Sequence, residues 1–173
     1  MKTKNIGLWA ITALAVSLLA VPAAYSQTER FSASLIGANE VPPINTAGRA
    51  DFNMTIQPSG ITFSLNFSDL SSPLAVAHLH FGVPNVTGGV MIFLCGGGNQ
   101  PACPATTSGT ITGTITAANV TGPVTQGVAV GDLETALRIV RDGLSYANMH
   151  TANFGSGEIR DQVRRGAGHG KGD

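Results

Sequence analysis

The chain has 173 residues, with ten basic and ten acidic side chains, and charged residues make up only 12% of it, about half the share found in a typical globular domain. This balance leaves no basic surface for phosphate groups, so nucleic acid is excluded as a partner. The length is sufficient for one domain with a sizeable hydrophobic core.

The N-terminal stretch, residues 1–26, has the pattern of a secretory signal peptide. Lys2 and Lys4 form a basic start, residues 6–21 form an apolar run, and residues 24–26 offer a cleavage site before Gln27. The run is short for a membrane-spanning helix, and no later segment is apolar enough to span. We therefore expect a secreted or periplasmic protein with no membrane span after cleavage.

Strand patterns dominate the mature chain. Residues 49–56 and 61–67 alternate apolar and polar side chains on either side of a Pro-Ser-Gly turn, which predicts a hairpin with one buried side. The same reasoning predicts strands at residues 31–35, 75–81, 90–94 and 109–115, and a closing hairpin at residues 144–151 and 158–163.

One helix is expected between Leu133 and Val140, with Asp132 as its N-cap and Gly143 as its stop. Together these elements predict an all-β fold, an antiparallel Greek-key β-sandwich of about eight strands with one short helix, over residues 27–163. The Gly-rich residues 164–173 are expected to form a disordered tail.

The two cysteines, Cys95 and Cys103, flank a Gly-rich stretch. In an oxidising compartment such a pair forms a disulfide, whereas metal ligation would need free thiols, which that compartment consumes. We therefore predict a disulfide that closes this short loop and stabilises the fold by roughly 2 to 3 kcal/mol.

Three histidines lie in strand-like segments. His78 and His80 share one face of a predicted strand, roughly 6 to 7 Å apart. Ala77 and Leu79 alternate with them, so the apolar pair should face the core and the imidazoles the outer side. With His150 on the closing hairpin, two interpretations stay open. Three neutral imidazoles suit copper or zinc; alternatively, the histidines form hydrogen bonds that stabilise the junction between strands.

The closing hairpin carries polar residues on both of its strands. Asn148 and His150 share a face of one strand, and Glu158 and Arg160 share a face of the other. We expect Glu158 and Arg160 near His150, supporting a metal ligand or attracting a small anion; the alternative is a charge pair on a solvated face. Glu40, before Val-Pro-Pro, is expected to hold a turn by reaching a buried donor.

Several segments together resemble the CHRD domain, the repeated module of chordin that also occurs alone in exported microbial proteins. They are Phe31-Ser-Ala-Ser-Leu, Gly37-Ala-Asn-Glu40-Val-Pro-Pro43, Ala77-His-Leu-His-Phe-Gly82, Gly109-Thr-Ile-Thr-Gly113, Tyr146-Ala-Asn-Met-His-Thr151 and Gly157-Glu-Ile-Arg160-Asp-Gln-Val163. The likeness covers about residues 31–163, and the family usually has Gly where this chain has Asp161. It implies a β-sandwich in an extracellular or periplasmic setting.

The histidine pattern is similar, more distantly, to that of copper-zinc superoxide dismutase, another exported β-sandwich with His-x-His on a strand and a loop disulfide. That resemblance implies copper on His78, His80 and His150, with Arg160 attracting superoxide. The chain departs from it because no histidine lies between His80 and His150, so the bridging ligand and the usual zinc ligands are absent.

These observations favour an exported, non-catalytic binding or structural module that carries a three-histidine site for copper or zinc. The alternative is a copper-dependent redox enzyme resembling superoxide dismutase. The expected partner is an extracytoplasmic protein or a small ligand. No catalytic residue is assigned, because no nucleophile lies in a motif that would activate it.

Overall fold

The structure, a computed structural model, describes residues 28–166. The strands are β1 (Glu29–Ile36), β2 (Arg49–Gln57), β3 (Gly60–Ser68), β4 (Leu74–Phe81), β5 (Gly89–Cys95), β6 (Gly109–Ile115), β7 (Ser145–Thr151), β8 (Ile159–Gln162) and β9 (Arg164–Arg165). The helical segments of this part of the chain are η1 (Gly37–Asn39), η2 (Ala117–Asn119), η3 (Val124–Gln126) and the α-helix α1 (Leu133–Arg141).

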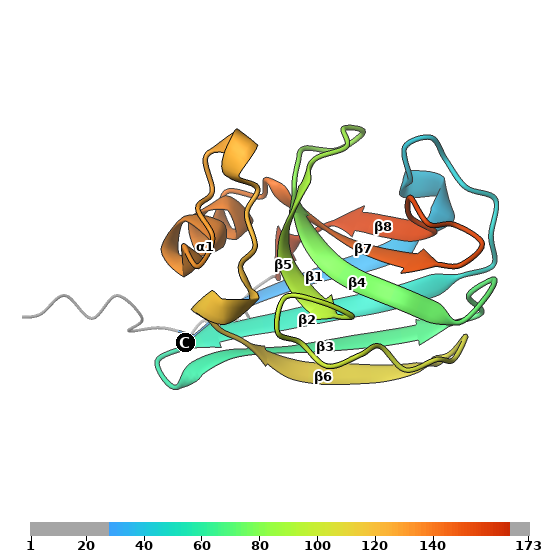
Figure 1. Cartoon of the computed structure of the whole chain (residues 1–173), viewed down its shortest axis with the longest axis horizontal. Helices are drawn as coiled ribbons and strands as arrows, with labels where there is room; N and C mark the ends of the chain where they lie inside the picture. The colour runs from blue at the N-terminus through green and yellow to red at the C-terminus, as the bar shows by residue number, and fades with distance from the viewer. Residues whose placement is uncertain (1–27, 167–173) are drawn as a thin grey trace, which may run out of the picture.

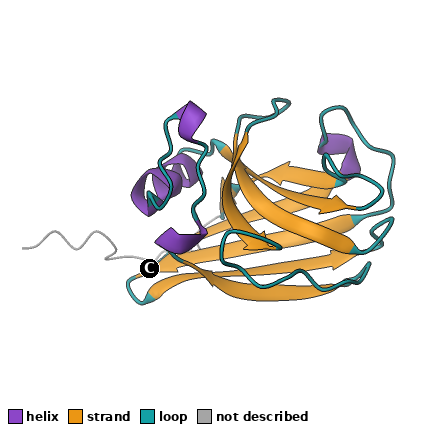
Figure 2. Ribbon diagram, viewed as in Figure 1, coloured by secondary structure: helices purple, strands orange, loops and turns teal. Residues whose placement is uncertain are grey.

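All the strands belong to one antiparallel sheet in the order β5-β4-β7-β8-β1-β2-β3-β6, with β9 beside β1. The sheet curls into a nearly closed barrel, and the helical segments lie at its two ends (Figures 1 and 2). Next to the seam between β5 and β6, Ile92 forms a bridge with Val120, and Thr121 N donates to Met91 O. The all-β class with one short helix is confirmed.

The sheet is continuous because β1 pairs on both of its edges. Its full length pairs with β2, while Ile36 pairs with Arg160 of β8 on the other side. The sequence patterns predicted a sandwich with two layers. In the structure, the corresponding strands form the opposite walls of one curved sheet.

The observed elements begin and end close to the predicted ones because the local signals are strong. The alternating runs of β2 and β3 pair residue by residue, from Arg49 opposite Ser68 to Gln57 opposite Gly60. Helix α1 begins after Asp132, whose side chain accepts a hydrogen bond from Thr135 N at 3.0 Å, and the chain leaves it at Gly143 with φ +70°.

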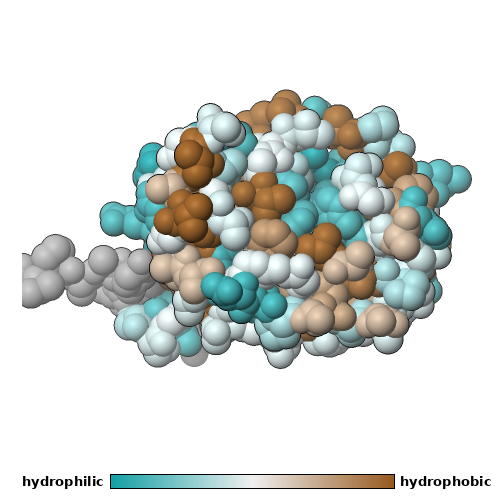
Figure 3. Space-filling view, viewed as in Figure 1, coloured by the Kyte–Doolittle hydropathy of each residue, from teal (hydrophilic) through white to brown (hydrophobic). Residues whose placement is uncertain are grey.

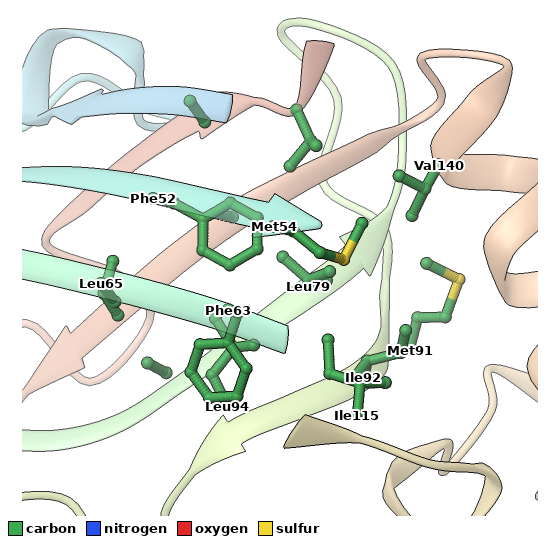
Figure 4. Packing of buried hydrophobic residues seen from close by; sticks show 14 of the residues in the cluster. Phe52, Met54, Phe63, Leu65, Leu79, Met91, Ile92, Leu94, Ile115 and Val140 are labelled. Atoms are coloured by element: carbon green, nitrogen blue, oxygen red, sulfur yellow. The ribbon is translucent and has the colours of Figure 1, made fainter. Parts of the chain in front are cut away.

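The hydrophobic core fills the inside of the barrel. Phe52 of β2 and Phe63 of β3, with ring centroids 6.5 Å apart, meet Leu79 of β4 and Leu94 of β5 from the opposite wall (Figure 4). Val140 of α1 closes one end of this cluster. Because the inward positions of the strands are occupied by apolar side chains, polar residues on β4, β7 and β8 must lie on the outer face.

The disordered tail was predicted to begin at residue 164, but the ordered chain continues beyond that point. Arg164 and Arg165 form β9 beside β1, Gly166 N donates to Arg30 O at 2.8 Å, and Arg165 forms an ion pair with Glu29 at 2.7 Å. The prediction of disorder is therefore wrong for residues 164–166, because backbone pairing to β1 compensates for their lack of apolar side chains. Residues 167–173 and the predicted signal peptide lie outside the described residues. Within residues 28–166, no helix is long and apolar enough to cross a membrane.

Candidate metal centre

The register of three neighbouring strands gathers the polar residues on one patch of the outer face. His78 of β4 lies opposite Asn148 of β7, and Asn148 lies opposite Arg160 of β8. Two residues further along β4, His80 lies opposite Tyr146. Two residues in the other direction, Val76 lies opposite His150. The predicted orientation of the histidines, away from the core, follows from this register.

The histidines are nevertheless buried. His78, His80 and His150 expose only 5%, 7% and 9% of their surface. The connections after β4 and β7 lie over them, and Phe93 on β5 packs edge-on against His78, with ring centroids 5.1 Å apart. In the space-filling view, the middle of this face is mixed, with hydrophilic residues next to hydrophobic ones (Figure 3). The three histidines on the outer face of the sheet are therefore buried under other parts of the chain and are scarcely exposed to solvent.

The three imidazoles converge closely enough to share one ion. One ring nitrogen from each lies within 4.8 Å of the other two. The ring centroid of His78 is 4.6 Å from those of both His80 and His150, in edge-on arrangements. Such a spacing allows three nitrogens to surround a single metal ion.

Backbone carbonyls orient two of the rings. His80 Nδ1 lies 2.9 Å from Gly88 O, and His150 Nδ1 lies 3.1 Å from Gly155 O. A carbonyl only accepts, so each Nδ1 carries the proton and each Nε2 keeps its lone pair. Both Nε2 atoms, and Nδ1 of His78, are buried without a hydrogen-bond partner among the described residues. This is the arrangement that metal-binding histidines show when their second nitrogen is held by a carbonyl.

Burial keeps all three imidazoles neutral. Loss of solvent, together with the neighbouring His80 and His150, lowers the pKa of His78 to about 2. Loss of solvent lowers the pKa of His80 to about 4, although the Gly88 carbonyl opposes the shift, and it lowers the pKa of His150 as well. Near neutral pH the nitrogens are therefore available as ligands without competition from protons.

Tyr146 and Arg160 extend the cluster on one side. The Tyr146 ring stacks on His80, with centroids 4.6 Å apart and planes 2° from parallel, and the Arg160 guanidinium carbon lies 3.5 Å from the Tyr146 centroid. Arg160 also donates twice to Val86 O at 3.2 Å. Arg160 is thus near the histidines, as expected, but Tyr146 lies between it and His80. The sequence patterns gave no role to Tyr146.

Asn148 connects the patch to the turn after η1. Its Nδ2 donates to Glu40 Oε1 at 2.8 Å, which confirms the expectation that Glu40 reaches a buried donor. Glu40 is only 7% exposed, and burial raises the pKa of its carboxyl group despite the hydrogen bond from Asn148. Because Asn148 stands between His78 and Arg160 in the sheet, this contact holds the middle of the polar patch in place.

Glu158 lies elsewhere. Its carboxylate accepts hydrogen bonds from Thr46 Oγ1, Ser71 N, Ser71 Oγ and Thr151 Oγ1, at 2.6 to 2.8 Å. These bonds join three connections at one end of the barrel. We expected Glu158 to support a metal ligand or to lie beside Arg160. Among the described residues, however, no hydrogen bond links Glu158 to a histidine or to Arg160.

The predicted disulfide between Cys95 and Cys103 is present, with Cα atoms 5.0 Å apart. The loop that it closes folds back on β5, where Gly97 and Gly98 lie against the ring of Phe93. Since Phe93 packs on His78, the disulfide loop forms part of the outer wall of the histidine cluster.

Gly157 is a glycine next to Glu40 and Asn148 that is expected to be sensitive to substitution. Its φ is +130°, and an added Cβ would lie 2.7 Å from Glu40 Oε1 and 3.0 Å from Asn148 Nδ2. Gly157→Ala should therefore lower the free energy of unfolding by about 2 to 3 kcal/mol. Gly155→Ala is the matched control from the same loop, because its Cβ would meet nothing within 4 Å. Equal denaturation midpoints for the two variants would contradict this prediction.

The fold and site together define a small β-barrel domain with a disulfide and a buried cluster of three imidazoles on its outer face. The sequence model of the CHRD domain family matches residues 31–163, and the chain belongs to this family. The match covers every member of the cluster. Comparison with curated proteins and with solved structures gives no significant match.

Proposed function

We propose that the protein is an exported, non-catalytic module that binds one copper or zinc ion through His78, His80 and His150. The observation that carries the proposal is the set of unpartnered ring nitrogens, one on each histidine, in a place where buried polar atoms normally have a partner. Leaving such atoms unpaired costs roughly 1 to 3 kcal/mol each. A bound metal ion would satisfy all three at once.

The alternative interpretation, histidines that only stabilise the sheet, fits these contacts less well. A structural histidine typically uses both nitrogens in hydrogen bonds when it is buried. Here the carbonyls of Gly88 and Gly155 take one nitrogen each and leave the inward one free. The rings meet edge-on rather than through hydrogen bonds to one another.

Export is supported by two independent features. The disulfide between Cys95 and Cys103 belongs in an oxidising compartment, and the first residues have the composition of a signal peptide. We propose a secreted or periplasmic location, with an extracytoplasmic protein or a small ligand as a further partner.

The dismutase-like alternative receives no support from the position of Arg160. Its guanidinium group is stacked on Tyr146 and bonded to Val86 O, and the residue is only 3% exposed. An arginine that attracts a dissolved anion needs a solvent-facing guanidinium group. We therefore propose binding rather than redox turnover.

Loading the purified protein with copper or zinc, followed by dialysis, should leave one tightly held ion per chain. His78→Ala/His80→Ala should bind more than about 100-fold more weakly, since even the loss of a residue that only supports a ligand costs 10- to 100-fold. His169→Ala, which replaces the fourth histidine of the sequence, is the matched control and should retain the ion. Metal content is measured by elemental analysis, with circular dichroism to check the fold. Wild-type protein that retains no metal would refute the proposal.

A further inference from the structure

The cluster has an unusual balance of charge for a site made to hold a divalent cation. The hydrogen-bond partners found for the imidazoles within residues 28–166 are two backbone carbonyls, and no carboxylate is among them. The charged side chain that acts on His80 is Arg160, which carries the same sign as a metal ion. A metal ion would therefore enter a neutral ligand set with a cation beside it.

The two nearby carboxylates are directed to other partners. Glu158 accepts four hydrogen bonds from Thr46, Ser71 and Thr151, all away from the imidazoles. Glu40 accepts from Asn148 and interacts electrostatically with Arg160, and among the described residues it forms no hydrogen bond with a histidine. Neither group provides the negative charge that usually accompanies a buried divalent ion.

Burial makes this difference in charge decisive. The cluster is at most 9% exposed and is walled by the rings of Phe93 and Tyr146. The cost of moving an ion out of water grows with the square of its charge, so a dication costs about four times as much as a monocation of the same size. The repulsion from Arg160 is likewise about twice as large for a dication.

The number of donors points the same way. The described residues supply three nitrogens to the cluster, whereas zinc prefers tetrahedral sites with a further ligand. The cuprous ion is satisfied by trigonal coordination, and imidazole is a suitable ligand for copper.

We propose that the site is selective for the monovalent cuprous ion over zinc and the cupric ion, and that the charge of Arg160 helps to set this preference. The inference rests on the proposed function and adds the oxidation state of the bound metal. It also implies that binding raises the reduction potential of copper, because the reduced ion is held more tightly than the oxidised one.

The test is a pair of competition titrations. Cuprous affinity is measured without oxygen, in ascorbate, against a colorimetric cuprous chelator, and zinc affinity is measured against a zinc dye. The wild-type protein should bind the cuprous ion more tightly than zinc. In Arg160→Met, which removes the charge but keeps the length, zinc affinity should rise about tenfold relative to cuprous affinity. Arg160→Lys keeps the charge and should keep the wild-type ratio.

Each outcome bears on a different part of the argument. Zinc binding as tight as cuprous binding in the wild type overturns the selectivity and leaves the metal site standing. The same zinc-to-cuprous ratio in the Met and Lys variants overturns the role of Arg160. Protein that binds neither ion overturns the proposed function itself, and with it this inference. The wild-type comparison decides the selectivity even where a variant fails to fold.

Discussion

Lowering the pH from 7 to 5 is expected to remove roughly 3 to 4 kcal/mol from the free energy of unfolding of the metal-free protein. The cause is the histidine cluster, in which burial lowers the pKa of His78 to about 2 and that of His80 to about 4. Many domains have a total stability of only about 5 to 15 kcal/mol, so this loss would be a large fraction of the free energy of unfolding.

The sign follows from which state takes up protons. In the unfolded chain a histidine titrates at about 6.5, whereas the folded protein keeps these imidazoles neutral to much lower pH. Protons therefore favour the unfolded state below about pH 6.5, and stability falls by about 1.4 kcal/mol per pH unit for each such histidine. The full stability is present above that pH. The contribution of His80 falls until the pH reaches about 4, and that of His78 continues to fall below pH 4. Glu40, whose pKa burial raises, acts in the opposite direction but as a single group.

The measurement is a series of urea-unfolding curves between pH 7.5 and pH 5, with EDTA present to remove metal. His78→Leu should flatten the dependence by up to one proton, because the variant has one histidine fewer to protonate on unfolding. Staying above pH 5 keeps Glu29 and Glu158, whose pKa values are lowered, out of the window. Parallel curves for the wild type and the variant would contradict the prediction.

Local patterns predicted the strands well because each signal is contained in a few residues. The alternation in β2 and β3 reflects one buried face, and the spacing of His78 and His80 on β4 places them on the same face of the strand. The cap at Asp132 and the turn at Gly143 are equally local. These features need no knowledge of the rest of the chain.

The surroundings of the site were less predictable because they depend on contacts distant in sequence. The connections that bury the histidines have no periodicity, so nothing in the pattern of β4 shows that its polar face is covered. The stacking of Tyr146 between His80 and Arg160 depends on the register of three strands. Only the alignment of these strands distinguishes a buried ligand set from residues on a solvated face.

Glu158 is the clearest example of a residue whose identity suggested one role and whose contacts give it another. On sequence grounds it belongs beside Arg160, two positions away on the same face. In the fold, the residue immediately before β8 lies where the connections after η1, β3 and β7 meet, and its side chain is 0% exposed. It therefore acts on the cluster indirectly, by fixing the connection after β7, whose Gly155 carbonyl orients His150.

Replacing Glu158 with alanine is expected to lower the free energy of unfolding by about 3 to 5 kcal/mol. The change leaves Ser71 N and the hydroxyl groups of Thr46, Ser71 and Thr151 without their acceptor in a buried place. Glu158→Gln should cost less, about 1 to 2 kcal/mol, since the amide oxygen still accepts and the hydroxyl groups can rotate to accept from the amide nitrogen. Glu134→Ala, an exposed carboxylate on α1, is the control and should change stability by less than about 0.5 kcal/mol.

The pH dependence separates a charge effect from a packing effect in these variants. Burial alone would raise the pKa of Glu158, but the hydrogen bonds from Thr151, Thr46 and Ser71 outweigh it and lower the pKa. The carboxylate thus stabilises the fold above about pH 4.5, and this contribution is lost as pH falls. Glu158→Gln should therefore approach the wild type in stability as the pH is lowered toward 3, while Glu158→Ala should stay well below it. An alanine variant within about 1 kcal/mol of the wild type at pH 7 would show that the three connections are held by other contacts.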